Sequence, residues 1–154
     1  MKSTRAENPI RISLPLGNTA DRALFGATEE VKRLRGLHLD TGHTLVGFLT
    51  PVFGILLPAG QTLSQVGVTI NSIKDIKQER REASQFVKPG FTLRMKKCLE
   101  AASKKAREEG TTSISDLHIL SAIIDDKIGI ASGILQKLGV DKEKLQEVIK
   151  NMSS

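Results

Sequence analysis

The chain contains the same pattern twice, and this internal repeat is the feature that most constrains its fold. At an offset of 75 positions, four residues recur: Leu24, Ala27, His43 and Leu45 align with Leu99, Ala102, His118 and Leu120. Each copy then ends on Leu-x-x-x-Gly-Val, at 63–68 and at 135–140, an alignment that needs three extra residues around Pro51 to Pro58 in the first copy. Two similar units of about 60 residues predict two related halves packed about a pseudo-twofold axis.

Composition limits the class of protein. The 154 residues are enough for one domain with its own core, which must be aliphatic because the chain has five Phe and no Trp or Tyr. The single cysteine cannot form an internal disulfide, which favours a reducing compartment. The N-terminus has no apolar run typical of a secretory signal, and the longest apolar stretch, 45–57, is interrupted and too short to span a bilayer. We therefore predict a cytoplasmic protein with no membrane partner.

The net charge of +6 favours acidic partners, but its distribution matters more than its sum. Basic residues are interleaved with acids, as in Glu29-Glu30-Val-Lys32-Arg33, which is typical of solvated helix faces. A basic nucleic-acid-binding patch is the alternative interpretation, and it would use Lys32, Arg33, Arg35, Lys96, Lys97, Lys104, Lys105 and Arg107. The scarcity of aromatic stacking residues and the interleaved acids disfavour it.

Apolar periodicity predicts helices throughout both copies. In the first copy, Ala20, Leu24, Ala27, Val31 and Leu34 form one stripe, Thr41 is the expected N-cap of the next helix, and Pro58 begins a third. In the second copy, the helix carrying Met95 and Cys98 stops at Gly110, Asp116 is the expected cap of the next, and Asp141 caps the last. A short helix at 70–76 and another at 130–138 complete an all-α fold of about eight helices, arranged as two four-helix units.

The same patterns divide the chain into segments that together form one domain. Residues 1–18 are polar and interrupted by proline, with an alternating piece at 10–14 that predicts an extended arm. Residues 19–76 form the first, divergent repeat, 77–90 a linker without apolar periodicity, and 91–152 the second repeat.

No motif for catalysis is present. The chain has no Gly-x-x-x-x-Gly-Lys-Ser/Thr phosphate loop and no Gly-x-Ser-x-Gly elbow, so we expect no enzyme activity, no catalytic residue and no cofactor. His38, His43 and His118 lack metal-ligand spacing, so no metal site is expected. Cys98 lies on an apolar stripe, as a core residue does. The equivalent His43 and His118 have either a functional role or a packing role in the first turn of their helices.

The second copy resembles the Clp N-terminal repeat. It contains Phe91-Thr-Leu-Arg-Met, Ser115-Asp-Leu-His118-Ile-Leu and Gly129-Ile-Ala, and it ends on Leu138-Gly-Val. The family pattern reads Phe-Thr-x-Arg-Ala, Gly-Thr-Glu-His-x-Leu-Leu, Gly-x-Ala and Leu-Gly-Val. The first copy resembles the pattern more distantly, through Asp40-Thr-Gly-His43-Thr-Leu. The resemblance covers about residues 19–150 and implies a non-catalytic helical domain.

In ClpC-, ClpA- and ClpB-type unfoldases, such domains precede ATPase rings and dock adaptors and client proteins. In ClpC-like members they also hold phosphorylated arginine, through the Thr of Phe-Thr and the Glu of Thr-Glu-His. This chain keeps Thr92 but has Leu117 in place of that Glu, and the first copy has Gly17 and Gly42 at the two positions. Without the carboxylate that would pair with a guanidinium, phosphoarginine binding is expected to be weak or absent.

The resemblance thus predicts a protein-interaction module of the Clp protease and chaperone system. Its expected partners are Clp ATPase or peptidase components, adaptors and clients. Because the chain starts at methionine and has no ATPase segment, we expect either a free-standing accessory protein or an excised N-terminal domain. The residues predicted to bind a partner or peptide are Phe91, Thr92, Met95, Asp116 and His118. Phe91 either anchors a partner or fastens its own helix to the core.

Overall fold

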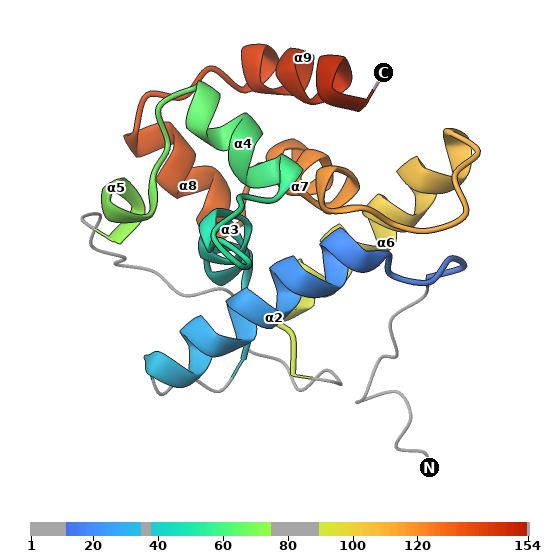
Figure 1. The fold of residues 1–154 in the computed structure, drawn as a ribbon, viewed down its shortest axis with the longest axis horizontal. Coiled ribbons are helices and arrows are strands. Elements are labelled where there is room, and N and C mark those ends of the chain that lie inside the picture. Colours follow the sequence, from blue (N-terminus) through green and yellow to red (C-terminus); the bar gives the residue numbers. More distant parts are fainter. Residues whose placement is uncertain (1–11, 35–37, 75–89, 154) are drawn as a thin grey trace.

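The computed structural model describes residues 12–34, 38–74 and 90–153. These contain eight helices and no strand (Figure 1): α2 (Asn18–Arg33), α3 (Thr41–Leu49), α4 (Pro58–Gln65), α5 (Ile70–Lys74), α6 (Leu93–Glu108), α7 (Asp116–Asp125), α8 (Ile130–Lys137) and α9 (Lys142–Ser153). The predicted all-α fold is confirmed. Residues 77–89 of the predicted linker, and the N-terminal arm up to Arg11, lie outside the described residues.

The helices pack around one aliphatic core. Helix α2 packs against α3, and α6 packs against α7, while α4 lies beside α9 and α7 (Figure 1). Phe48 is fully buried, as are many aliphatic side chains such as Leu45, Leu120 and Leu135. Cys98 is buried in this core, as its position in the stripe predicted. The prediction was wrong for Leu34, which is 51% exposed because it is the C-cap of α2 rather than a residue within the helix.

Backbone hydrogen bonds join the two repeats in a reciprocal way. The N–H of Gly17 donates to the carbonyl of Ile114 at 2.7 Å, and the N–H of Thr92 donates to the carbonyl of Leu39 at 3.0 Å. Gly17 and Thr92 are 75 positions apart, as are Leu39 and Ile114, so these two bonds are equivalent under the sequence repeat. A second equivalent pair runs from Ile114 to Pro15 at 2.9 Å and from Leu39 to Gly90 at 2.8 Å. Each repeat therefore pairs with the other as the other pairs with it, which is the predicted pseudo-twofold arrangement.

Helices α3 and α7 begin one residue earlier than predicted. Their N-caps are Asp40 and Ser115, whose side chains accept from the N–H groups of His43 at 2.8 Å and His118 at 3.3 Å. Each histidine returns the interaction, because its Nδ1 accepts from the N–H of its N-cap residue, at 3.0 Å and 2.9 Å. Both histidines thus close capping boxes, which supports the packing interpretation. The predicted starts at Pro58 and Asp141 are confirmed.

Helices α2 and α3 cross with their backbones in contact. A Cβ atom added to Gly47 would lie 2.1 Å from the carbonyl oxygen of Ala23 and 2.8 Å from the backbone nitrogen of Ala27. Gly26 faces the same crossing, since its Cβ would lie 3.2 Å from the Gly47 Cα. This close approach keeps α2 near α3 and so fixes where the outer face of α2 lies on the molecule.

Candidate docking surface

Two buried side chains, one in each repeat, cap a helix of the other repeat. Neither α4 nor α8 receives a hydrogen bond from its own N-cap side chain. Instead, Asp116 Oδ2 accepts from the N–H of Ala59 in α4 at 2.8 Å, and Thr41 Oγ1 accepts from the N–H of Ala131 in α8 at 3.0 Å. Thr41 and Asp116 are equivalent in the repeat, so the exchange is symmetric. The sequence therefore predicted the capping role of these residues correctly but assigned it to the wrong helices.

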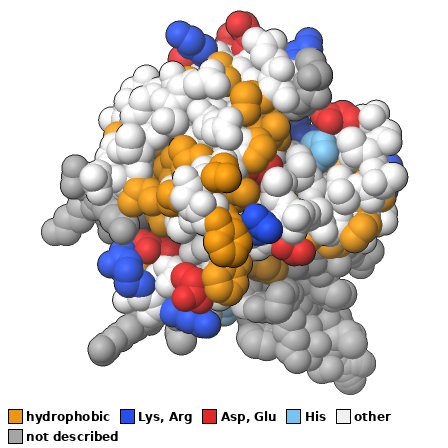
Figure 2. All heavy atoms as spheres, in the orientation of Figure 1, with side chains coloured by type: hydrophobic (Ala, Val, Ile, Leu, Met, Phe, Trp, Pro, Cys, Tyr) orange, Lys and Arg blue, Asp and Glu red, His pale blue; other side chains and the backbone are white. Residues whose placement is uncertain are grey.

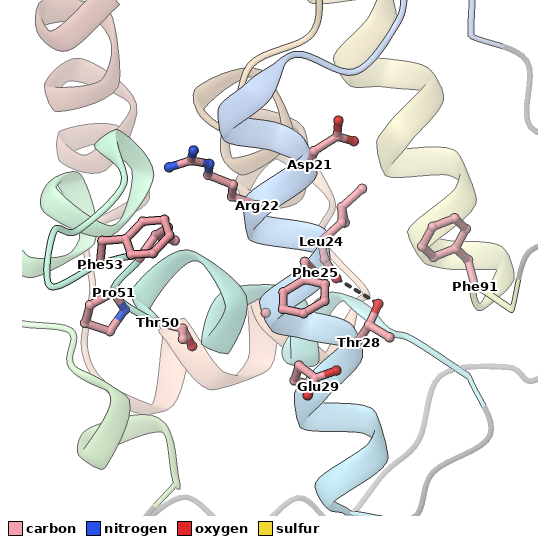
Figure 3. A pocket seen from close by; sticks show the side chains of 12 residues that line it. Asp21, Arg22, Leu24, Phe25, Thr28, Glu29, Thr50, Pro51, Phe53 and Phe91 are labelled. Atoms are coloured by element: carbon pink, nitrogen blue, oxygen red, sulfur yellow. Dashed lines mark hydrogen bonds between the residues drawn. The ribbon is translucent and has the colours of Figure 1, made fainter.

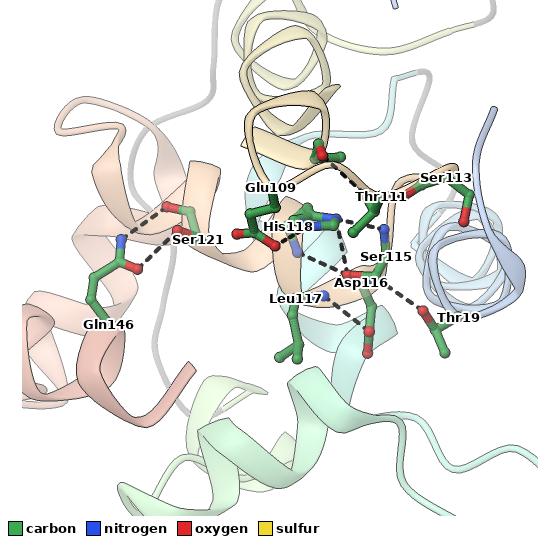
Figure 4. Close-up of polar contacts among 11 residues, drawn as sticks. Thr19, Glu109, Thr111, Ser113, Ser115, Asp116, Leu117, His118, Ser121 and Gln146 are labelled. Carbon is green, nitrogen blue, oxygen red and sulfur yellow. Dashed lines mark hydrogen bonds and ion pairs between the residues drawn. The ribbon is translucent and has the colours of Figure 1, made fainter. Parts of the chain in front are cut away.

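Asp116 has no further surface to offer a partner. It is 1% exposed, and its Oδ1 accepts from the N–H of Leu117 at 2.9 Å while its own N–H donates to Thr19 Oγ1 at 3.1 Å (Figure 4). Burial raises the pKa of Asp116, and the hydrogen bonds it accepts oppose that change. These contacts make Asp116 a structural residue of the repeat interface.

His118, Thr92 and Met95 are also buried in structural contacts. His118 Nδ1 accepts from the Ser115 N–H, so its Nε2 carries the hydrogen and donates to Glu109 Oε1 at 2.9 Å (Figure 4). Thr92 is the N-cap of α6 and accepts from the N–H of Met95 at 3.1 Å. The Met95 side chain is fully buried, and its sulfur accepts from Thr44 Oγ1 at 3.3 Å. Thr92 and Met95 therefore present little surface to a partner, whereas His118 lines a second pocket of about 620 Å³ between α6, α7 and α9.

Phe91 differs from the other four because it reaches the surface. It precedes α6, bridges to Leu39 through the backbone, packs partly against the core and lines a surface pocket of about 650 Å³. The pocket extends over the outer face of α2 to residues 50–53, the connection that follows α3 (Figure 3). Phe91 thus packs partly on the core, as its fastening role requires, and is also accessible from the pocket; its role as a partner anchor stays a prediction.

The pocket is bordered by aromatic side chains that the sequence interpretation missed. Phe25 on α2 is 67% exposed and Phe53 is 93% exposed, with Ile55 at 68% beside it. In Figure 3, Phe53 and Pro51 lie on one side of Phe25, and Phe91 lies on the other side of α2. Figure 2 shows hydrophobic side chains gathered in a band on this face, with charged side chains at its edges. A contiguous exposed apolar surface of this kind is typical of an interaction site.

Phe53 is held at the tip of a tight turn. The N–H groups of Val52 and Ile55 each donate to the other residue's carbonyl, at 2.9 Å and 3.0 Å. Between them, Phe53 has a φ of 51° and Gly54 a φ of 80°, as in a two-residue turn of type I′. A positive φ is costly for a bulky side chain, so the local backbone conformation disfavours Phe at position 53.

In the second repeat, charged side chains occupy the equivalent surface. Asp125 and Asp126 stand at the positions of Thr50 and Pro51, and Glu100 stands at the position of Phe25. Asp126 pairs with Arg94 at 3.1 Å and Asp125 pairs with Lys105 at 2.8 Å. The two repeats thus share a backbone plan, but the second has ion-paired aspartates where the first has Thr50 and Pro51 in the lining of the pocket.

Both missed aromatics had a signal in the sequence. Phe25 lies off the apolar stripe of Ala20, Leu24 and Ala27, on a helix face that is otherwise polar. Phe53 stands between Pro51 and Gly54, in the segment where the first copy is three residues longer than the second. An apolar residue outside a stripe or within an insertion is a candidate for exposure.

Four of the eight basic residues of the alternative interpretation pair with acids. Lys32 pairs with Glu29, Arg33 with Glu30, Lys96 with Glu100 and Lys105 with Asp125. Arg107 donates to Ser13 Oγ at 2.8 Å, and Arg35 lies outside the described residues. Within the described ranges, no cluster of three or more His, Cys, Asp or Glu side chains is placed to hold a metal ion. No helix in those ranges has the length and apolar character needed to cross a membrane.

Comparison with known proteins agrees with this architecture. Residues 90–154 match the family model described as the Clp repeat (R) N-terminal domain. The chain carries a Clp repeat domain. The resemblance noted in the second copy is therefore confirmed, and the first copy completes the domain in three dimensions.

Relatives and a solved structure extend the match to most of the chain. The negative regulator of genetic competence ClpC/MecB from Bacillus subtilis is 31% identical over 131 residues, which are 84% of this chain and 16% of that protein. The chaperone protein ClpB from Oceanobacillus iheyensis is 28% identical over 134 residues, again 84% of this chain and 16% of the relative. The N-terminal domain of the chaperone ClpD from Arabidopsis thaliana has the same fold, with a TM-score of 0.68, 22% identity, and coverage of 90% of this chain and 97% of that one. This chain thus spans about one sixth of the length of these curated relatives.

Proposed function

We propose that this chain is a non-catalytic protein-interaction module of the Clp ATP-dependent protease and chaperone system. It docks adaptors, client proteins or the ATPase ring itself through the pocket on α2. The single buried cysteine, Cys98, fits the reducing cytoplasm that we propose as its location. The observation that carries the proposal is the apolar pocket bordered by Phe25, Phe53 and Phe91 on a Clp repeat domain.

Exposed aromatic side chains are efficient contacts for a protein partner. They bury a large area, and their few rotatable bonds make the entropy loss small. The position of Phe53 on a backbone with positive φ supports the same conclusion, because the fold alone favours Asn or Gly there. Phe91 is the residue of the predicted binding set that remains part of the proposed surface.

The proposal is tested by removing the two exposed rings. The variant F25S/F53N keeps a residue that tolerates positive φ at position 53. With the tagged chain as bait in a lysate of its own cells, we expect the wild type to capture Clp ATPase or Clp peptidase. The purified component so identified should bind F25S/F53N at least about tenfold more weakly, the range expected for loss of an aromatic anchor.

The matched control is I128S, which removes an apolar side chain that is 64% exposed in the second repeat. Both variants should keep the wild-type melting temperature within a few degrees, because exposed side chains contribute little to stability. Capture of no Clp component by the wild type, or equal binding by F25S/F53N and wild type, would contradict the proposal.

A further inference from the structure

We propose that the pocket on α2 selects a peptide segment whose apolar side chain is flanked by lysine or arginine. This inference rests on the docking function proposed above and specifies the chemistry of the partner. It is carried by the charges that surround Phe25 and by their reversal in the second repeat.

Phe25 lies between two acidic residues on one face of α2. Asp21 is one turn before it and Glu29 one turn after it, and both line the pocket (Figure 3). Glu29 pairs with Lys32 at 3.4 Å, but the two side chains are 53% and 71% exposed, so water screens this pair and the carboxylate stays accessible. A peptide that places its apolar side chain against Phe25 therefore brings its neighbouring residues close to two carboxylates.

The other charged residue that lines the pocket does not cancel this pattern. Arg22 is the single basic side chain among the twelve lining residues, against the two acids. Figure 3 shows it on the side of α2 that faces Phe53, whereas Asp21 points towards the side of Phe91. The pocket is thus slightly acidic in a chain whose net charge is +6.

The second repeat shows that helix packing does not require these acids. The residues equivalent to Asp21, Phe25 and Glu29 are Lys96, Glu100 and Lys104, so the pattern acid–aromatic–acid becomes base–acid–base at the same offset of 75. Both helices are 16 residues long and both pack on the following helix. Since the shared fold accepts either charge pattern, we attribute the pattern around Phe25 to what binds there.

The dimensions and charge of the pocket fit a short peptide. A volume of about 650 Å³ lies within the range of sites that enclose a small ligand or a few side chains. Carboxylates on both sides of Phe25 along α2 repel phosphate groups, which disfavours nucleic acid and anionic lipid at this face. A protein segment with an apolar side chain and basic neighbours complements both the apolar pocket and these two carboxylates.

The test uses two fluorescein-labelled decapeptides with the same central Leu-Phe pair. One has Lys and Arg on both flanks, and the other has Glu at those positions. Fluorescence anisotropy at low salt should show that the wild-type chain binds the basic peptide about tenfold more tightly than the acidic one, and that added salt reduces this preference. The variant D21K/E29K, which installs the lysines of the second repeat, should abolish or invert the preference.

The matched control is E108K/E147K, which makes the same change in net charge at two exposed positions outside the pocket. It should keep the preference, and the melting temperature of each variant will show that it folds. If both peptides bind equally and replacement of Phe25 abolishes their binding, the preference for basic flanks is wrong. The docking function proposed above is not contradicted by that result. If neither peptide binds, the inference is also wrong, and capture of the Clp component separately decides the docking function.

Discussion

At the scale of single residues, Asp116 shows how a capping role can be predicted correctly and assigned to the wrong helix. Asp40 and Thr41, like Ser115 and Asp116, are adjacent residues that all favour N-cap positions. Local preference therefore could not decide which of each pair caps its own helix. The decision comes from across the repeat interface, because α4 in the first repeat and α8 in the second lack cap side chains of their own and use Asp116 and Thr41, respectively.

The buried carboxyl of Asp116 gives the protein a pH-dependent stability. Because burial raises the folded-state pKa of this carboxyl, its stabilising contribution is complete below the unfolded-state pKa and is lost as pH rises through the folded-state value. D116N keeps an acceptor for Ala59 and does not titrate. We therefore expect the wild type to lose stability relative to D116N as pH rises from acidic to neutral, measured by urea unfolding at several pH values.

The control for this prediction is D116A, which removes the acceptor altogether. It should cost about 1–2 kcal/mol of unfolding free energy at acidic pH, the usual effect of losing a helix cap. A difference between wild type and D116N that stays constant with pH would show that the titration of Asp116 does not affect folding.

At the scale of helices, the sequence predicted the elements well because the apolar stripes and stop signals agree. Gly67, Gly110 and Gly139 each follow a helix with positive φ, as a C-terminal glycine should. The candidate site was harder to predict, because Thr92, Met95 and Asp116 were chosen for an expected groove between the two repeats and are buried in this fold. Phe25 and Phe53 depend on which helix face is left uncovered, and that is decided by tertiary packing.

The crossing of α2 and α3 gives a prediction at the same scale. G47A should destabilise the protein by about 3 kcal/mol or more, because its Cβ would overlap the backbone of Ala23 and the helices would have to separate. The second repeat has Ala122 at the equivalent position, so the residue type itself is acceptable in this fold. Thermal and urea unfolding measure the effect.

A second glycine serves as the control. Gly133 lies within α8, and a Cβ added there meets nothing within 4 Å. G133A should therefore leave stability unchanged or raise it by up to about 1 kcal/mol, since alanine favours helix more than glycine does. Equal effects of G47A and G133A would show that the crossing tolerates a wider separation than its geometry indicates.

At the scale of the whole molecule, the exchanged caps and backbone bonds make the two repeats one unit. Each half supplies a helix cap to the other, and each supplies two backbone hydrogen bonds across the interface. The halves also bury a shared core of aliphatic side chains. A half on its own would lack the side chain that accepts a hydrogen bond from the first turn of its third helix, which is α4 in the first repeat and α8 in the second.

We therefore expect the chain to stay together when it is cut between the repeats. After cleavage at a protease site inserted within residues 77–89, the two fragments should elute as one species in gel filtration and unfold in one transition. The same cut in a T41A/D116A background should lower the stability of the complex by about 2 kcal/mol, one cap at each of two helices. Separation of the wild-type fragments at micromolar concentration would contradict this picture.

The reciprocal caps also set an order of events during synthesis. The acceptor for Ala59 belongs to Asp116, so α4 is complete in the chain 51 residues before its cap, counted from Gln65 to Asp116. A ribosome extends the chain by about 5–20 residues per second, so this helix waits for seconds with its first turn uncapped. During that interval the first repeat also exposes the core surface that the second will cover. A nascent chain of this protein is thus open to capture by chaperones until its second half emerges.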